Sequence, residues 1–275
     1  MEKELLKTED LCFSYGDDNF ALNKINISVL KNDFLSVIGR NGSGKSTLVK
    51  LISGIYSQYN GKVYLHCKDI CSYSKKEVSK ILSYLPQSSL NGNNGLNVFE
   101  FLLLGRYAYK RFSDFSFSEY DKKSVQDSIE VTGISNFIKK SVNELSGGEK
   151  QKVLITLSLV QLDINSDLSD KILIIDEPLT FLDVNFQYEI FSILEKLNKE
   201  KKLTVILVTH NINLALKYTG KTLLLDKGEM IVFDETKKVI TEDIIEKYFR
   251  VKSKIISFDD DYHILTNNLK QANGK

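Results

Sequence analysis

Nine consecutive residues, GRNGSGKST over 39–47, have the types and spacing that hold phosphate groups in proteins. They fit the pattern G-x-x-x-x-G-K-[ST]. Their glycines let the backbone turn tightly, so that consecutive N–H groups can face phosphate oxygens. In this pattern the lysine, here Lys45, reaches the β- and γ-phosphates, and the next hydroxyl, here Ser46, ligates Mg²⁺. The segment therefore predicts a nucleotide-binding site.

The residues around this loop support the same interpretation. The apolar run Phe34–Ile38 predicts a strand before the loop, and Leu48–Ile52 predicts a helix after it. That is the context in which such a loop binds phosphate. The alternative is a glycine-rich turn that only joins the two elements, and a chance match in a chain this long has a probability of about one in a hundred. Nucleotide binding is therefore favoured.

Two adjacent carboxylates follow a second apolar run. Ile172–Ile175 predicts a buried strand, and Asp176 and Glu177 come at its carboxyl end, the edge of an open α/β sheet where ligands bind. There Asp176 can hold Mg²⁺ through water, and Glu177 can polarise the water that attacks the γ-phosphate. Considered alone, the pair could equally be two solvated acids on a surface turn. The phosphate loop favours the catalytic interpretation.

Two further polar residues also follow predicted strands. His210 comes after Leu203–Thr209, and Gln87 comes after Ile81–Leu85. A lone histidine is usually structural and an isolated glutamine usually lies at the surface. Their position at strand ends favours a place in the site. We expect His210 to sense the γ-phosphate, and the Gln87 amide to meet both Mg²⁺ and the attacking water.

Composition limits the class of protein. The chain has 275 residues, of which 42% are hydrophobic and 27% charged, as in ordinary globular domains. Lys and Arg number 37 against 36 Asp and Glu, which gives no support for a nucleic-acid partner. No run approaches the roughly 18 apolar residues that span a bilayer, and Met1–Lys7 lacks the apolar part of a signal peptide. We expect the chain to stay in the cytosol, so that any role at a membrane comes through a partner.

The three cysteines, Cys12, Cys67 and Cys71, fit a reducing compartment without disulfides. His66, Cys67 and Cys71 are close enough in sequence to raise a metal site as an alternative. No second pair of ligands follows them, and Val63–Cys67 predicts a strand. We therefore expect ordinary strand and loop residues.

The order of the elements predicts an α/β fold with a mostly parallel, doubly wound sheet. A helical pattern from Asn97 to about Asp163 interrupts the strands as an insertion. The polar stretch Asp163–Lys171 predicts a loop-like excursion. Near the end of the chain, Val251–Phe258 and His263–Thr266 predict a hairpin.

The segment Leu145–Gln151 (LSGGEKQ) resembles the signature sequence of the ATP-binding subunits of ABC transporters. The other motifs of that family occur in order: the phosphate loop, YLPQ, IIDE, LD and TH, which end at Gln87, Glu177, Asp183 and His210. As a helix start, the signature can be capped by Ser146, and its two glycines let backbone N–H groups approach an anion.

The phosphate loop already holds one nucleotide, so the signature must serve another. The resemblance implies a head-to-tail dimer, with a second copy or with a paralogous cassette, that sandwiches two ATP molecules. Each ATP lies between one phosphate loop and the opposite signature. The resemblance also implies that Asp183 ties the two halves at the dimer interface and that Tyr15 stacks on adenine.

The predicted site can be given in full. The expected cofactors are ATP and Mg²⁺, and the catalytic residues are Glu177, His210 and Gln87. ATP binding is assigned to Tyr15, Gly39, Arg40, Asn41, Gly42, Ser43, Gly44, Lys45, Ser46 and Thr47. The opposite ATP is assigned to Leu145, Ser146, Gly147, Gly148, Glu149 and Gln151. The Mg²⁺ ligands are Ser46, Gln87 and Asp176.

The resemblance implies the ABC ATPase fold, a P-loop NTPase with an antiparallel N-terminal β subdomain. We expect a single domain over 1–275, divided into a RecA-like core with the β subdomain (1–87 and 165–240), a helical subdomain (88–164) and a C-terminal extension (241–275).

Weaker signals indicate the subfamily. Asn97–Tyr107 and Phe115–Ser118, with the tail segments Ile240–Asp243 and Tyr248–Val251, resemble importers of iron–siderophore, haem and cobalamin. That implies an integral-membrane permease, contacted between Gln87 and about Lys110, and indirectly an extracytoplasmic substrate-binding protein. Alternatives are an exporter, a lipid-extracting ATPase or a soluble regulatory ATPase. The chain departs from the family's usual residues at Leu157, Leu179 and Phe181.

Overall fold

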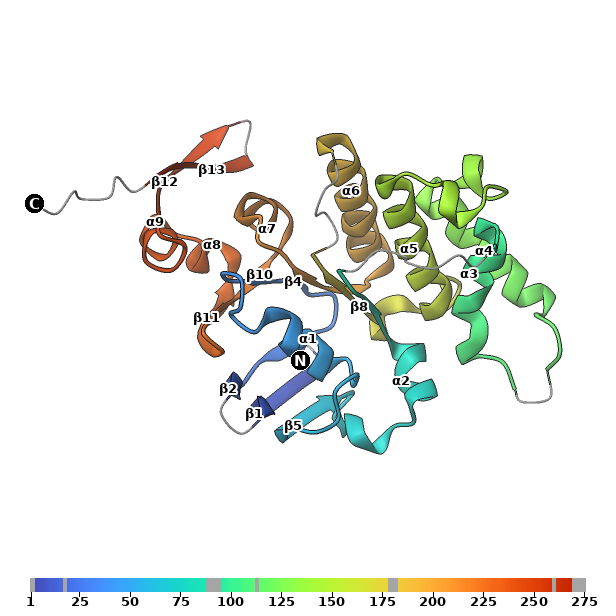
Figure 1. Cartoon of the computed structure of the whole chain (residues 1–275), viewed down its shortest axis with the longest axis horizontal. Helices are drawn as coiled ribbons and strands as arrows, with labels where there is room; N and C mark the ends of the chain where they lie inside the picture. The colour runs from blue at the N-terminus through green and yellow to red at the C-terminus, as the bar shows by residue number, and fades with distance from the viewer. Residues whose placement is uncertain are drawn as a thin grey trace, which may run out of the picture.

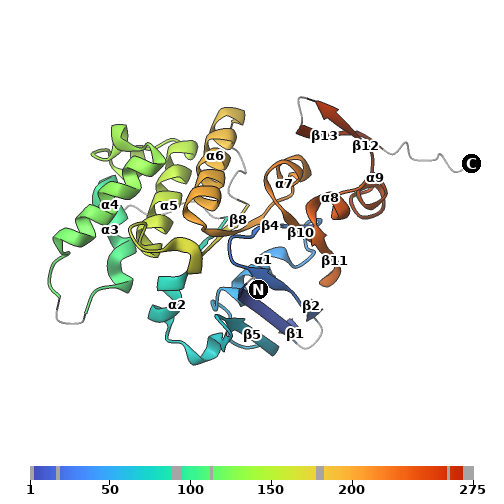
Figure 2. The ribbon, with the colours of Figure 1, turned by 180° about the vertical axis from the view of Figure 1, so that it is seen from behind.

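The computed structural model describes residues 3–16, 19–87, 95–111, 114–177, 183–258 and 261–268. One large sheet runs through it in the order β6-β5-β1-β2-β11-β10-β4-β9-β8-β7, with β3 beside β1. Figures 1 and 2 show helices α3, α4 and α5 at one end of the molecule and the hairpin of β12 and β13 at the other. Leu179, Phe181 and Leu182 lie outside the described residues.

The centre of the sheet is parallel. β4 pairs with β9 and β10, and β8 pairs with β7 and β9. β4, β8 and β9 are buried along their whole length, which is why their sequences are continuous apolar runs. Their carboxyl ends meet at one edge, so the residues that follow them come together. The bounds are β4 Phe34–Ile38, β7 Leu82–Leu85, β8 Ile172–Asp176, β9 Thr204–Val208 and β10 Lys221–Asp226.

The other strands of this sheet are mainly antiparallel. β1 pairs in this way with β2, β3 and β5, and β10 with β11. A parallel centre with antiparallel N-terminal strands confirms the predicted α/β fold. The bounds are β1 Glu4–Gly16, β2 Asn19–Ile25, β3 Ser28–Leu30, β5 Asn60–Leu65, β6 Lys68–Asp69 and β11 Glu229–Glu235.

The strand predicted over Val63–Cys67 is wrong at its end. β5 stops at Leu65, and His66 and Cys67 form a turn into β6 with φ of 51° and 60°. Such left-handed φ values are incompatible with a continuing strand. In the described ranges, no group of three or more His, Cys, Asp or Glu side chains could hold a metal ion.

Helices cover both faces of the sheet. Alternate residues of β8 enter two different cores: Leu173 and Ile175 pack with α5 and α6 residues, and Ile172 and Ile174 pack with those of α1. Figure 1 shows α6 and α1 on opposite sides of the sheet. The bounds are α1 Lys45–Ile52, α2 Lys75–Ile81, α3 Val98–Leu103, α4 Glu119–Thr132, α5 Gly147–Leu162, α6 Val184–Lys201 and α7 Ile212–Tyr218. Short 3-10 turns cover Ile70–Ser72, Leu104–Ala108, Ser135–Phe137, Val142–Glu144 and Leu168–Asp170.

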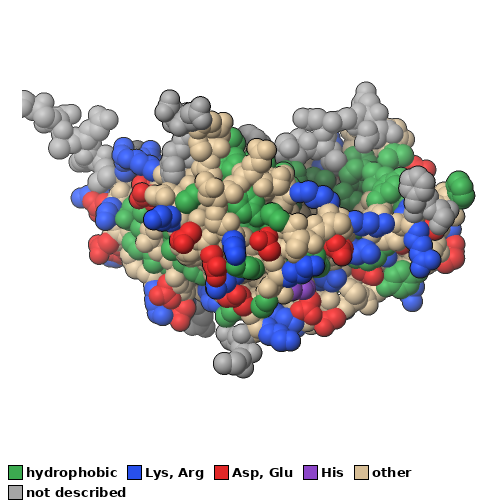
Figure 3. Space-filling model, turned by 90° about the horizontal axis from the view of Figure 1, so that it is seen from below, with side chains coloured by type: hydrophobic (Ala, Val, Ile, Leu, Met, Phe, Trp, Pro, Cys, Tyr) green, Lys and Arg blue, Asp and Glu red, His purple; other side chains and the backbone are tan. Residues whose placement is uncertain are grey.

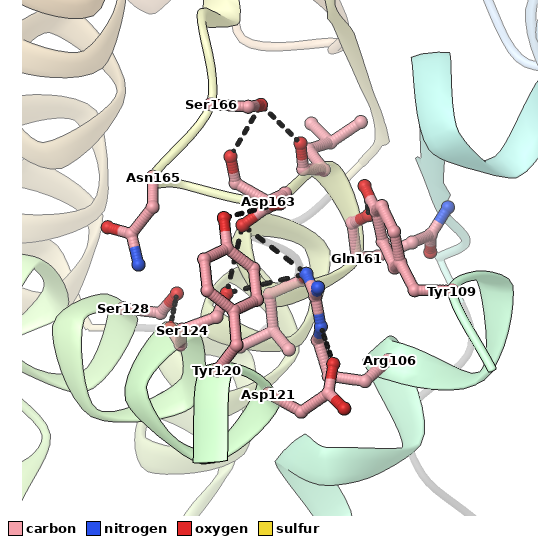
Figure 4. A network of polar contacts seen from close by, with 12 residues as sticks. Arg106, Tyr109, Tyr120, Asp121, Ser124, Ser128, Gln161, Asp163, Asn165 and Ser166 are labelled. Atoms are coloured by element: carbon pink, nitrogen blue, oxygen red, sulfur yellow. Dashed lines mark hydrogen bonds and ion pairs between the residues drawn. The ribbon is translucent and has the colours of Figure 1, made fainter. Parts of the chain in front are cut away.

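A buried arginine joins three parts of the helical region (Figure 4). Arg106, which follows α3, is 1% exposed. Its Nε donates to Asp121 Oδ1 on α4 at 2.8 Å, and its Nη1 donates to Val160 O on α5 at 3.2 Å and lies 3.4 Å from Asp163 Oδ1. Asp163 was predicted to begin a polar excursion, but it is buried where α5 ends. The rest of the stretch forms turns and a short 3-10 turn, as predicted for a loop-like excursion. The burial of Asp163 itself was not predicted.

The C-terminal part forms a third core with α7. Its elements are α8 Thr236–Val239, α9 Glu242–Ile244, a π-helical turn Ile245–Phe249, and the strands β12 Val251–Phe258 and β13 Asp261–Asn268. These two strands pair with each other, which confirms the predicted hairpin.

In the described ranges, no helix is both long and apolar enough to cross a membrane. On the face drawn in Figure 3, basic and acidic side chains are interspersed.

Candidate functional site

The phosphate loop lies between β4 and α1, as predicted. Gly39 has φ of 149°, and a Cβ there would overlap the Leu225 carbonyl of β10. Gly44 caps α1 in the left-handed region, with φ of 102°. Glycine is required at both places because a side chain would collide or strain the backbone. The loop therefore brings its N–H groups to the N-terminus of α1, where anions bind favourably.

Lys45 lies at the bottom of this loop and is 5% exposed. Its Nζ donates to Gly39 O at 2.9 Å and to Arg40 O at 3.1 Å, and it lies 4.0 Å from Glu177 Oε1. Burial lowers the pKa of Lys45, and the charges of Glu177 and Asp176 oppose that shift. The Lys45 ammonium thus donates to two neutral carbonyl oxygens. A negatively charged phosphate oxygen can take their place and form a stronger hydrogen bond.

Asp176, at the end of β8, is 2% exposed and holds two hydroxyl groups. Ser46 Oγ donates to its Oδ1, and Tyr84 Oη donates to its Oδ2, each at 3.1 Å. Burial raises the pKa of Asp176, while the bonds from Ser46 and Tyr84 oppose the rise. Tyr84 was not among the predicted residues. It belongs to the YLPQ segment, and it reaches Asp176 because β7 runs beside β8, with Tyr84 in parallel register with Ile174.

The residues predicted for Mg²⁺ offer suitable chemistry. Mg²⁺ prefers oxygen ligands and keeps several waters. Ser46 Oγ and Asp176 Oδ1 are already within hydrogen-bond distance, and the Gln87 side chain reaches the neighbouring Glu177. This set of a hydroxyl, a carboxylate and an amide fits a magnesium ion beside a phosphate.

Glu177 connects the remaining predicted residues. Gln87 Nε2 donates to Glu177 Oε2 at 2.9 Å, and His210 Nδ1 lies 3.6 Å from the same oxygen. Glu177 has a left-handed φ of 47°, and its N–H donates to Val208 O of β9 at 3.0 Å. That hydrogen bond fixes the turn after β8 and directs the carboxylate toward the phosphate loop.

A cavity of about 430 Å³ joins the loop to these groups. Its lining residues are Tyr15, Asn41, Gly42, Gly44, Lys45, Ser46, Thr47, Gln87 and Glu177. Tyr15 is 57% exposed, and its hydroxyl lies 2.9 Å from Thr47 Oγ1. Its ring meets Phe13 edge-on. An exposed aromatic ring held at the cavity margin can stack on a base.

The signature residues lie elsewhere. Ser146 caps α5, and Ser146 and Glu149 form a reciprocal capping box. Gly148 packs on α6, because a Cβ there would come within 2.6 Å of the Phe186 ring. Asp183 is exposed and caps α6 by accepting from Phe186 N at 2.9 Å. In the described part of the chain, none of these residues lines the phosphate-loop cavity.

The chain is similar in sequence to known ATP-binding proteins. The profile of the family described as ABC transporter matches residues 22–180. The iron(3+)-hydroxamate import ATP-binding protein FhuC of Bacillus subtilis is 34% identical over 92% of this chain and 90% of its own length. The ferric enterobactin transport ATP-binding protein FepC of Escherichia coli is 30% identical over 91% of this chain and 89% of its own.

Solved structures show the same fold. An inward-facing transporter assigned to the metal-chelate type matches with a TM-score of 0.81 and 25% identity, covering 98% of both chains. A dimeric ATP-binding cassette in a post-hydrolysis state, bound to ADP and Pi, matches with a TM-score of 0.71 and 25% identity. That match covers 84% of this chain and 99% of the other.

Proposed function

The chain belongs to the ABC transporter family, and we propose that it is the ATP-hydrolysing subunit that energises a membrane importer of ferric siderophore, haem or cobalamin. The observation that carries the hydrolytic part is the single cavity shared by the phosphate loop, Gln87 and Glu177. Lys45 and Glu177 both line that cavity, which supports binding of a phosphate and of the attacking water in one space.

The chemistry follows from these positions. Lys45 exchanges its backbone acceptors for phosphate oxygens and stabilises their charge. Glu177 accepts a proton from the attacking water, and Gln87, which donates to Glu177, orients that water. His210, whose Nδ1 lies 3.6 Å from the carboxylate oxygen that Gln87 also contacts, responds to the γ-phosphate. When bound through Ser46 and Asp176, Mg²⁺ neutralises phosphate charge.

The signature residues of this chain, all of which the structure describes, do not line its own phosphate-loop cavity, which supports a dimer in which they serve the nucleotide of a partner. Ser146 and Gly147 are exposed at the N-terminus of α5, where N–H groups favour an anion. A second copy, or a paralogous cassette, can present its nucleotide to them. ATP then closes the dimer, and hydrolysis and release reopen it, which moves an attached permease.

The importer assignment rests on relatives whose names specify iron(3+)-hydroxamate and ferric enterobactin. We infer that the subunit lies at the cytoplasmic face of the membrane, against a permease that receives cargo from an extracytoplasmic binding protein. The test is uptake by vesicles that contain this chain, its permease and the binding protein. We expect ATP-dependent uptake of a ferric siderophore, haem or cobalamin, absent with Glu177→Gln. Uptake of none of them, or outward transport only, would overturn the proposal.

A further inference from the structure

The two carboxylate oxygens of Asp176 accept hydrogen bonds from hydroxyl groups on two different elements of the fold. Oδ1 accepts from Ser46, which belongs to the phosphate loop, and Oδ2 accepts from Tyr84, which belongs to β7. The serine hydroxyl is a predicted Mg²⁺ ligand. Tyr84 is not among the residues that line the cavity. Within the described part of the chain, its hydroxyl donates to Asp176 Oδ2.

The position of Tyr84 is fixed by its strand. β7 and β8 are parallel, with Tyr84 opposite Ile174 and Leu85 opposite Ile175. The Tyr84 ring packs against the core that includes Ile172, Ile174 and Leu82. The hydroxyl is therefore presented to Asp176 from a rigid element, whereas Ser46 lies in the first turn of α1.

A phenol suits this place for a physical reason. A carboxylate that is 2% exposed loses most of its hydration, and a hydrogen bond restores part of that energy. A neutral donor does so without adding positive charge. A lysine or arginine in the same place would neutralise the carboxylate and compete with a cation.

We propose that Tyr84 is a positioning residue, which holds the Asp176 carboxylate in the orientation that binds Mg²⁺ beside the nucleotide. The inference rests on the proposed ATP site and deepens it. Tyr84 acts only through Asp176 Oδ2, so its hydroxyl and the carboxylate form one functional unit. Residues that orient a metal ligand change metal affinity by roughly 10- to 100-fold when they are removed.

The test is Tyr84→Phe, which removes one oxygen and keeps the ring in the core. Binding of a fluorescent ADP analogue is titrated against Mg²⁺, without turnover. We expect the Mg²⁺ concentration at half-saturation to rise about tenfold, with ADP binding in EDTA unchanged. Tyr73→Phe is the matched control, because it removes a phenol that donates to Leu65 O at 3.0 Å, outside the site.

A double-mutant cycle separates positioning from folding. In an Asp176→Asn background, Tyr84→Phe should leave the Mg²⁺ dependence unchanged, because the residue it serves has gone. Three results overturn the proposal: wild-type Mg²⁺ dependence in Tyr84→Phe, an equal shift in Tyr73→Phe, or the full shift persisting beside Asp176→Asn. A wild-type chain that does not bind ADP would overturn the proposed function as well.

Discussion

Gln87 Nε2 donates a 2.9 Å hydrogen bond to Glu177 Oε2, although the two residues are 90 positions apart in the chain. Parallel strands β7 and β8 end side by side, so the residues after them meet. This pair directs a carboxylate and an amide into the cavity that also contains Lys45.

Glu177→Gln should bind ATP and fail to hydrolyse it. The amide keeps the shape of the side chain but cannot accept a proton from water, and loss of such a base costs roughly 10²- to 10⁴-fold in rate. Steady-state phosphate release measures the loss of hydrolysis, and equilibrium titration measures the retained ATP binding. Glu195→Gln, on the outer side of α6, should turn over like the wild type. Substantial turnover by Glu177→Gln would remove this residue as the base.

Lys45→Ala should lose nucleotide affinity. A charge-assisted hydrogen bond contributes about 1.5–3 kcal/mol, so the dissociation constant should rise by roughly 10- to 100-fold. Calorimetric titration with ADP measures it. Lys199→Ala is the control, since its side chain is 70% exposed and pairs with Glu195, a neighbour on α6. Equal affinities for the wild type and Lys45→Ala would contradict the assignment of the phosphate loop.

Arg106→Met should destabilise the folded chain. The substitution leaves Asp121 and Asp163 without their buried cation (Figure 4), and breaking such a pair costs about 3–5 kcal/mol. Urea unfolding measures the change. Lys122→Met, whose ion pair with Glu119 is exposed, should cost less than about 1 kcal/mol. Equal stabilities for the two variants would show that the Arg106 network is not stabilising.

The same network should be sensitive to acid. Burial acts to raise the pKa of Asp121, but hydrogen bonds from Ser118 and Arg106 outweigh it and hold the pKa below its ordinary value of 3.8. A carboxyl whose pKa falls on folding stabilises the folded state above its unfolded pKa and loses that contribution as pH falls through the folded pKa. The stability difference between wild type and Asp121→Asn should therefore be constant near neutrality and shrink below pH 3.8. A difference that persists in acid would contradict this origin.

Much of the site could be predicted because its signals are local. The phosphate loop needs glycines at fixed spacing, and Asp176 and Glu177 directly follow an apolar strand. The parallel sheet then brings the strand ends to one edge, as general rules for α/β folds require. Gln87 and His210 could be placed for the same reason.

Contacts away from the ends of the parallel strands could not be predicted. Nothing near Arg106 in the sequence indicates that Asp163 would be its buried partner, and Asp163 itself has the sequence context of a polar loop. Tyr84 resembles any aromatic residue in a strand until its register with β8 is known. Gly148 could be assigned to anion binding from its motif, but its packing on Phe186 depends on how α5 meets α6.

The central claim is that the phosphate loop and the signature of one chain serve different nucleotides. Gly147→Glu tests it directly: an acidic residue at the first position of α5 favours the helix but repels a phosphate brought by a partner. In a Glu177→Gln background, light scattering should show an ATP-induced dimer, and adding Gly147→Glu should abolish it while each monomer binds ATP unchanged. A dimer that forms undiminished, or a monomer that loses ATP affinity, would contradict the account.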